Sequence, residues 1–378
     1  MVNLLMCAVT RRSKSFGATL SVSSLLSEIG IAMVSIYLPL YSYLLGANEF
    51  VVGVIGAVTS ITYIFASLFC GLLSYKFGTK ITLLIGFTIT SLTHALYFFI
   101  PQPILFIPIR ALEGLGWSFI WPSLEALAGE DSSSLRAFNT MWGLGLTVAP
   151  AVGGILSQLT ELTNVFLISS SLTALCFLLN ILKLTRVQNK VIKERGADSS
   201  SKKIFTPSLF FYSFLYAFAS SIILTFFPIY SNSKKIPISN VGYILTVMNF
   251  GRLLAFNLPV NMKKVSDERK TLPACVISVS FLSLLVFFSN LWTLFISLFI
   301  SGFTLGLLYA MVQAHVITMA GEERRGYYAS MFESILGVGF FFGPFCGGIV
   351  AGLSINYVFL LPLIFTIFFF FLKFINTL

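Results

Sequence analysis

The sequence predicts an all-α membrane protein whose twelve transmembrane helices form two pseudo-symmetric six-helix halves. The first reason is composition: 57% of the 378 residues are hydrophobic and 10% are charged, and the mean hydropathy is +0.92. Such a chain has too little polar surface to cover a soluble globule of this size. The second reason is a glycine-proline motif that occurs once in each half of the chain, which indicates an internal repeat.

The expected spans follow from the length that a helix needs to cross a bilayer, about 20 apolar residues. Turns and charge clusters divide the chain into twelve such stretches, and the shortest breaks are Pro101-Gln102-Pro103 and Ser289-Asn290. The spans are expected near residues 18–44, 50–73, 80–100, 103–128, 137–159, 164–184, 208–231, 239–260, 272–288, 291–319, 328–350 and 355–375.

Basic residues predict the orientation of the bundle. With the N-terminus in the cytoplasm, most lysines and arginines fall in cytoplasmic loops, whereas Lys234 and Lys235 lie outside. This is the bias that orients membrane proteins, so both termini are expected in the cytoplasm and the protein in the cell membrane. The same distribution explains the net charge of +10 without a nucleic-acid partner.

A polar stretch in the middle of the chain separates the two halves. It contains the run Gly196-Ala-Asp-Ser-Ser-Ser201, which is charged, poor in aromatic residues and typical of a flexible linker. We therefore expect a cytoplasmic N-terminal segment at 1–17, a first six-helix half at 18–184, a cytoplasmic linker at 185–207 and a second six-helix half at 208–378.

The repeated motif places small residues at helical spacing in the fifth and eleventh spans. Each copy follows an Ala-Gly pair and two acidic residues, and each contains a proline. Small residues four apart permit close helix packing in lipid, so the motif either packs helices alone or also takes part in a rocking motion of the halves. Its members are Gly145, Pro150, Gly153 and Gly154 in the first copy, and Gly339, Gly343, Pro344, Gly347 and Gly348 in the second.

Three motifs in order along the chain resemble those of the major facilitator superfamily of secondary transporters. The first two are Gly71-Leu-Leu-Ser-Tyr75-Lys76-Phe-Gly78-Thr-Lys80 after the second span and Arg110-Ala-Leu-Glu113-Gly114-Leu-Gly116 in the fourth. The third is the glycine-proline motif, which resembles a fifth-span motif associated mainly with antiporters in that superfamily.

The resemblance implies two halves around a central cavity that opens alternately to either side of the membrane. It also implies gating roles for Gly71, Lys76 and Gly78 in the loop after the second span. The chain departs from the family pattern at Tyr75, where an acidic residue is expected, and at Ala149, where the fifth-span motif has glycine. The charge-pairing gate of the family is therefore expected to be weakened or built differently here.

Ionisable residues inside the expected spans are the candidates for coupling to protons. Glu28 lies near the middle of the first span with no cation close in sequence, and a charge at that depth needs a partner, an aqueous cavity or a proton. It fits a site that alternately binds and releases a proton, and it resembles the first-span acid of drug/proton antiporters. The alternative is a protonated Glu28 that only bonds a neighbouring helix.

Two arginines also lie within spans. Arg110 and Glu113 are three residues apart on one face of the fourth span and can pair with each other; the resemblance implies instead that this arginine takes part in proton movement. Arg252 has no acid within one helical turn. It therefore favours an anionic or carbonyl-rich substrate, or else pairs with a carboxylate such as Glu28 on another helix.

Aromatic pairs spaced four apart form stripes on two spans, Tyr37 with Tyr41 and Trp117 with Trp121. They either line a substrate cavity or serve helix packing and lipid contact. The two histidines and five cysteines are dispersed, so no metal site or disulfide framework is expected.

We therefore expect a secondary active transporter that works by alternating access, with proton-coupled efflux of a small organic molecule as the preferred function. The alternative is a symporter or uniporter that imports a sugar or organic anion, which Arg110 and Arg252 keep open. An enzyme is not expected, because the chain lacks a nucleophile-base pair, a metal motif and a phosphate-binding loop. The expected partners are the substrate, protons and the lipid bilayer, with no cofactor and a functional monomer.

Overall fold

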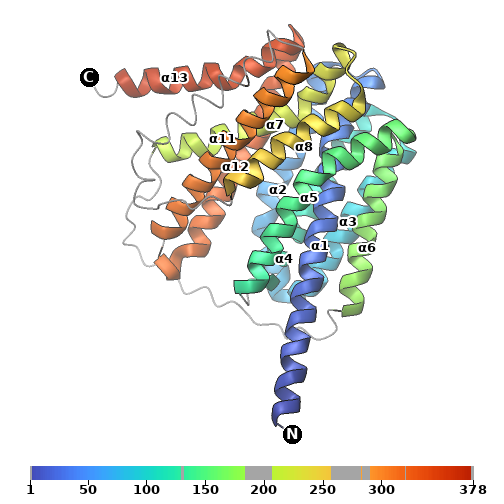
Figure 1. Cartoon of the computed structure of the whole chain (residues 1–378), viewed down its shortest axis with the longest axis vertical. Helices are drawn as coiled ribbons and strands as arrows, with labels where there is room; N and C mark the ends of the chain where they lie inside the picture. Colours follow the sequence, from blue (N-terminus) through green and yellow to red (C-terminus); the bar gives the residue numbers. More distant parts are fainter. Residues whose placement is uncertain are drawn as a thin grey trace.

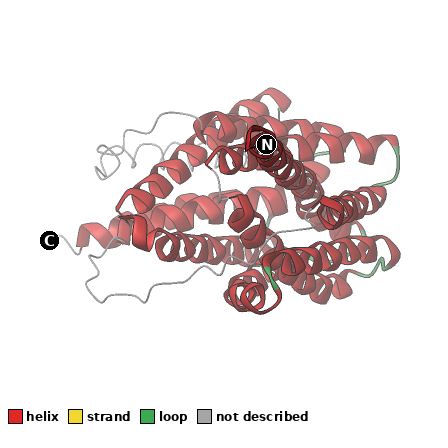
Figure 2. Ribbon diagram, turned by 90° about the horizontal axis from the view of Figure 1, so that it is seen from below, coloured by secondary structure: helices red, strands yellow, loops and turns green. Residues whose placement is uncertain are grey.

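The computed structural model describes residues 2–128, 132–183, 207–256, 282, 290–319 and 321–375. Within these residues the chain is helical apart from short turns, in agreement with the all-α class. Figure 1 shows the helices of the first half, in blue to green, beside those of the second half, in yellow to red. Figure 2 looks onto the N-terminus from below and shows the helices joined by short loops.

Six helices form the first half and agree with the six expected spans. α1 begins at Val2, so helix continues through the expected N-terminal segment 1–17, and the part apolar enough to span a membrane begins at Gly17. The six are α1 (Val2–Leu44), α2 (Glu49–Phe77), α3 (Thr79–Phe99), α4 (Pro103–Ala128), α5 (Ser132–Leu159) and α6 (Asn164–Lys183).

The described part of the second half contains the corresponding elements. These are α7 (Pro207–Ser233), α8 (Ile238–Phe256), α11 (Leu291–Met319), α12 (Gly321–Ala351), the 3-10 helix η2 (Ile355–Leu360) and α13 (Leu361–Ile375). The twelfth expected span is therefore built from η2 and α13 rather than from one α-helix. The ninth expected span, 272–288, and the linker 185–207 lie outside the described residues except for Leu282 and Pro207.

Ten helices of the described chain are long and apolar enough to cross a membrane. α8 is not among the ten, and it carries the polar side chains Asn249 and Arg252. It nevertheless packs against α5 and α11, and this packing buries both polar side chains.

The turn between α2 and α3 shows why the loop motif needs a glycine. Gly78 has a φ of 89°, a region that other residues rarely adopt. Its N–H bonds to the Ser74 carbonyl at 2.9 Å and ends α2, and α3 begins at the next residue. Lys76 is exposed here, with its ammonium group 5.3 Å from the centre of the Phe77 ring, and Gly71 lies in α2 one turn before Tyr75.

Helices of the two halves meet mainly in three pairs, α2 with α12, α5 with α8, and α1 with α7, and α2 also touches α7. We call the end of the bundle where α6 ends and α7 begins the linker end. At the other end, the opposite end, backbones approach closely at glycines: a Cβ on Gly348 would lie 3.0 Å from Gly53, and one on Gly154 would lie 3.2 Å from Gly242. Side chains larger than hydrogen would separate these helices, so the halves are joined through glycine contacts.

The repeated motif makes the same contacts in both halves. Gly145 packs α5 against α1, and its counterpart Gly339 packs α12 against α7. Gly153 and Gly347 each face an aromatic ring on that first helix, Tyr37 and Phe226. The last glycine of each copy then contacts the second helix of the other half. The internal repeat indicated by the sequence is thus present at the level of single contacts.

The contact at Gly242 gives a prediction about stability. A Cβ there would collide with the Pro150 carbonyl and lie 3.0 Å from the Tyr37 hydroxyl, which itself donates to that carbonyl at 2.6 Å. Gly242→Ala should therefore destabilise the protein by about 1–3 kcal/mol through overpacking, measured as a lower midpoint of thermal unfolding in detergent. Gly143→Ala is the control on the same helix pair, because its Cβ would meet only the tip of Leu253. Equal midpoints for the two variants would contradict the prediction.

Candidate functional site

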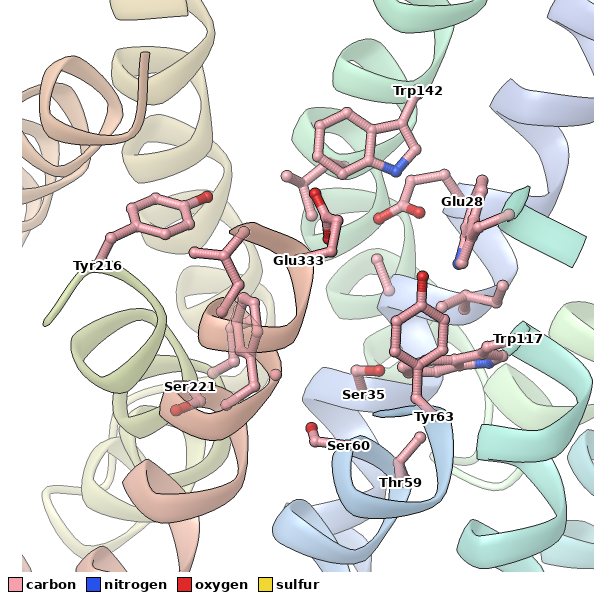
Figure 3. A pocket seen from close by; sticks show the side chains of 18 of the residues that line it. Glu28, Ser35, Thr59, Ser60, Tyr63, Trp117, Trp142, Tyr216, Ser221 and Glu333 are labelled. Atoms are coloured by element: carbon pink, nitrogen blue, oxygen red, sulfur yellow. The ribbon is translucent and has the colours of Figure 1, made fainter. Parts of the chain in front are cut away.

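A cavity of about 350 Å³ lies between the two halves. Its walls come from α1, α2, α4 and α5 of the first half and from α7, α8, α11 and α12 of the second. Figure 3 shows the two walls, with Glu28, Tyr63 and Trp117 on one side and Tyr216 and Ser221 on the other. The volume suits a small organic molecule, since ligand cavities in proteins typically measure about 300–1,000 Å³.

The cavity lies on the linker side of the glycine contacts. Its lining residues on α4 run toward the linker end as far as Glu125, and those on α5 begin near that end at Phe138 and Asn139. Glu125, Asn139 and Glu333 are exposed although they belong to spanning helices. The cavity therefore opens toward the linker end, whereas the halves are closely packed at the opposite end.

Glu28 lies on the α1 wall of this cavity and is only 6% exposed. Gly145 of α5 packs directly against its side chain, and the indole of Trp142, one turn earlier on α5, hydrogen-bonds to its carboxyl group. No ion pair to Glu28 is present among the described residues. A carboxylate in this position is neutralised by a proton or by a cationic ligand in the cavity.

Arg110 and Glu113 are the centre of a buried network in the first half. The Arg110 guanidinium lies 2.9 Å from the Glu113 carboxylate, which also contacts His94 Nε2 at 3.2 Å and accepts a hydrogen bond from the Tyr97 hydroxyl at 2.6 Å. Glu113, His94 and Tyr97 are fully buried. The Arg110 guanidinium also lies 5.4 Å from the centre of the Trp117 ring, so one end of the network reaches the cavity wall.

The sequence did not indicate the contribution of α3 to this network. His94 has no partner close in sequence, but it contacts Glu113 across the α3–α4 hairpin. A sequence signal existed: His94 and Tyr97 are three residues apart, as are Arg110 and Glu113, so each pair shares a helix face. The hairpin brings the two faces together.

Arg252 lines the second-half wall and is 3% exposed. It donates to the Ser220 hydroxyl at 3.1 Å, and its guanidinium lies 5.4 Å from the centre of the Tyr216 ring. Its Nε is buried and has no hydrogen-bond partner. No carboxylate lies within ion-pair distance of Arg252 in the described part of the chain.

Glu125 and Glu333 line the cavity from opposite halves. Both are exposed near the linker end, and their side chains face the cavity and lie close enough to interact electrostatically. The position of a residue along a helix does not reveal which face looks inward, so the sequence alone could not show this.

The predicted aromatic stripes have different surroundings. Trp117 and Trp121 line the cavity. Tyr37 bonds the Pro150 carbonyl, and Tyr41 packs with its ring centre 5.3 Å from that of Phe166; neither is among the described residues of the cavity wall. Of the motif residues, Pro344 reaches the cavity, while the glycines pack helices and Pro150 receives the Tyr37 bond.

Ionisable groups of the cavity break the internal symmetry that the glycines preserve. Gly145 faces Glu28 on α1, and its counterpart Gly339 faces Ala217 on α7. Glu28 and Ala217 therefore occupy corresponding positions. Tyr63 lies as far along α2 from Gly53 as Arg252 lies along α8 from Gly242. Tyr63 and Arg252 therefore occupy corresponding positions in the two halves. Glu28 and Arg252 therefore have no charged counterpart in the other half, which is expected where chemistry rather than packing selects the residue. No group of three potential metal ligands occurs among the described residues.

The family model of the Major Facilitator Superfamily matches residues 20–267 and 209–377. The chain belongs to this superfamily. It is therefore an integral, multi-pass membrane transporter and not an enzyme. The predicted membership of the superfamily is thus confirmed.

Relatives of the chain carry names from one branch of the superfamily. The chain is 29% identical to multidrug resistance protein MdtG of Enterobacter lignolyticus, covering 89% of this chain and 85% of that one. It is 25% identical to multidrug resistance protein 2 of Bacillus subtilis, covering 88% of both chains.

Solved structures share the fold at low sequence identity. The nucleoside transporter NupG has a TM-score of 0.72 at 14% identity, and the match covers 94% of this chain and 98% of its own. An inward-facing bacterial homologue of the human lysosomal transporter Spinster has a TM-score of 0.70 at 12% identity, covering 90% of this chain and 82% of its own.

The buried network predicts a specific pattern of stability. Glu113→Leu leaves the Arg110 cation buried without its partner, so it should destabilise the protein by about 3–5 kcal/mol. Replacing Arg110 and Glu113 together by leucine should destabilise it less than Glu113→Leu alone, because no unpaired charge remains. Midpoints of thermal unfolding measure both, with the exposed Glu161→Gln as a control. A double variant less stable than Glu113→Leu would contradict this account.

Proposed function

We propose that the protein exports a small organic molecule in exchange for protons. The observation that carries this proposal is Glu28, a buried carboxyl group on the wall of a solvent-accessible cavity without a cationic partner among the described residues. A proton and a cationic group of the substrate can each neutralise this carboxylate, but not at the same time. Competition for one site couples the outward movement of substrate to the inward movement of protons.

The protein cycles between this state, open toward the linker end, and one open toward the opposite end. The glycine contacts of α2 with α12 and of α5 with α8 are the surfaces on which the halves rock. The names of the two multidrug resistance relatives support export as the direction, since the alignments cover most of each chain. The functional unit is a monomer, because the cavity and both walls belong to one chain.

Import of an organic anion or a sugar is the second candidate function. Arg252 favours it, because a buried cation on the cavity wall attracts an anion or a carbonyl group. The direction of transport in reconstituted vesicles distinguishes the two functions. Under an imposed proton gradient, an antiporter moves substrate in the direction opposite to proton flow, whereas a symporter moves substrate and protons in the same direction.

Glu28→Gln tests the proposed coupling. Glutamine keeps the size and hydrogen-bonding capacity of the side chain but cannot exchange a proton, so we expect proton-driven transport to fall at least about tenfold even at substrate concentrations that saturate each variant. The measurement is uptake into proteoliposomes under an imposed pH gradient, using the compound that most stabilises the wild type in a thermal-shift screen. Glu161→Gln, an exposed acid of the α5–α6 turn, should transport normally. Normal accumulation by Glu28→Gln would exclude Glu28 as the coupling site.

We also propose that the linker end faces the cytoplasm of the cell. The basic residues of the expected loops support this orientation, with the exposed Lys76 at the linker end and Lys234 and Lys235 at the opposite end. A green fluorescent protein fused after Leu378 should fluoresce, and alkaline phosphatase fused at the same residue should be inactive. The reverse pattern would invert the orientation.

A further inference from the structure

The second-half wall of the cavity holds an incompletely satisfied cation. Arg252 uses one of its terminal nitrogens to bond Ser220 and lies over the Tyr216 ring. Its Nε stays buried without a partner, although a guanidinium has five N–H donors available. The neighbouring Gln313 and Tyr309 hydroxyl bond each other at 3.1 Å and also line the cavity. This wall therefore offers hydrogen-bond donors to whatever enters.

The placement is unfavourable unless a ligand uses it. Burying a cation in a membrane protein costs at least about 2.5–3.5 kcal/mol, and the other buried arginine, Arg110, offsets this with a carboxylate at 2.9 Å. Glu28 could have served Arg252 in the same way, but no ion pair joins them. An acceptor group brought by a ligand would supply the missing partner.

Coupling constrains what that ligand can be. A purely anionic ligand at Arg252 would bind most readily when Glu28 carries a proton. The anion and the proton would then cross the membrane in the same direction. A cation at Glu28 alone would exclude the proton but leave Arg252 unsatisfied. A molecule with a basic group and an acceptor group meets both requirements, because its basic group competes with the proton while its acceptor reaches Arg252.

We propose that Arg252, held in place by Ser220 and Tyr216, binds a hydrogen-bond acceptor of the substrate; we call this the acceptor subsite. The proposed substrate class is aromatic molecules with a basic group for Glu28 and a carboxylate for Arg252. The inference rests on the proposed function, in which Glu28 exchanges a proton for a cationic substrate. The aromatic part is favoured because Trp117, Trp121 and Trp142 line the space on the Glu28 side and Tyr216, Tyr309 and Phe340 line it on the Arg252 side.

The test uses sets of three matched probes. Aminomethyl-arene carboxylic acids on benzene, naphthalene and biphenyl frames are each compared with their methyl ester and with the amine-free acid. In the wild type, the zwitterion of at least one frame should bind about ten- to a hundredfold more tightly than either partner, as expected for a charge-assisted hydrogen bond at each end. Dissociation constants are measured on the purified protein in detergent by calorimetry or thermal shift.

The variants separate the two ends of the ligand. Arg252→Gln should abolish the preference for the zwitterion over the ester and keep its preference over the amine-free acid. Glu28→Gln should abolish the preference over the amine-free acid and keep the preference over the ester. Arg252→Lys keeps the charge and should restore part of the preference over the ester. Lys234→Gln is the control, since Lys234 also lies over a tyrosine ring, 5.6 Å from the centre of Tyr230, but on the surface.

Binding and transport failures remain distinguishable. Absence of any zwitterion that binds more tightly than its ester in the wild type, including absence of all binding, would overturn the acceptor subsite. An ester preference unchanged in Arg252→Gln would overturn it as well. If the preferences behave as expected but Glu28→Gln still accumulates substrate under a pH gradient, the subsite stands and the proposed proton coupling fails.

Discussion

Close backbone contact at glycines is the constraint on which the structure depends. Helices in lipid gain little from hydrophobic association, so their packing rests on van der Waals contact at short distance. Each copy of the repeated motif packs its helix against the first helix of its own half and then, through its last glycine, against the second helix of the other half. One short motif thus builds each half and joins the two. Because these contacts lie toward one end of the bundle, a cavity remains between the walls at the other end.

Charge in the cavity wall is neutralised in two different ways. Glu113 is surrounded by Arg110, His94 and Tyr97, so its charge is neutralised without a ligand, although His94 Nδ1 is buried without a hydrogen-bond partner. We interpret the ion pair as a fixed part of the first half. Glu28 and Arg252 have only neutral partners in the described residues, Trp142 for one and Ser220 with Tyr216 for the other. A charge that is paired inside the protein does not depend on a ligand, whereas a charge without an ion pair responds to what the cavity contains.

The sequence predicted the helices well and the site only partly. Apolar length predicted the spans, and motif spacing predicted the internal repeat, because both depend on local composition. The burial of Glu28 followed from its depth in the first span. The sequence did not show which helix faces meet, because this depends on how each helix is rotated about its axis. Examples are the positions of Trp142 beside Glu28 and His94 beside Glu113, and the inward direction of Glu333. Close packing outside the motif was also hidden, since a Cβ on Gly302 would collide with the Met248 carbonyl.

The departures from internal symmetry connect the site to the motion of the halves. Glu28 belongs to the first half and Arg252 to the second, so a rocking motion of one half against the other changes the separation of the two walls. A ligand that contacts both walls stabilises the arrangement in which both contacts form, and a proton on Glu28 acts on one wall only. If Glu28 and Arg252 stood on one wall within ion-pair distance, they would neutralise each other and neither ligand would favour a particular separation. Because these two charges lie on different halves and no ion pair to either is present among the described residues, the conformation depends on which ligand is bound.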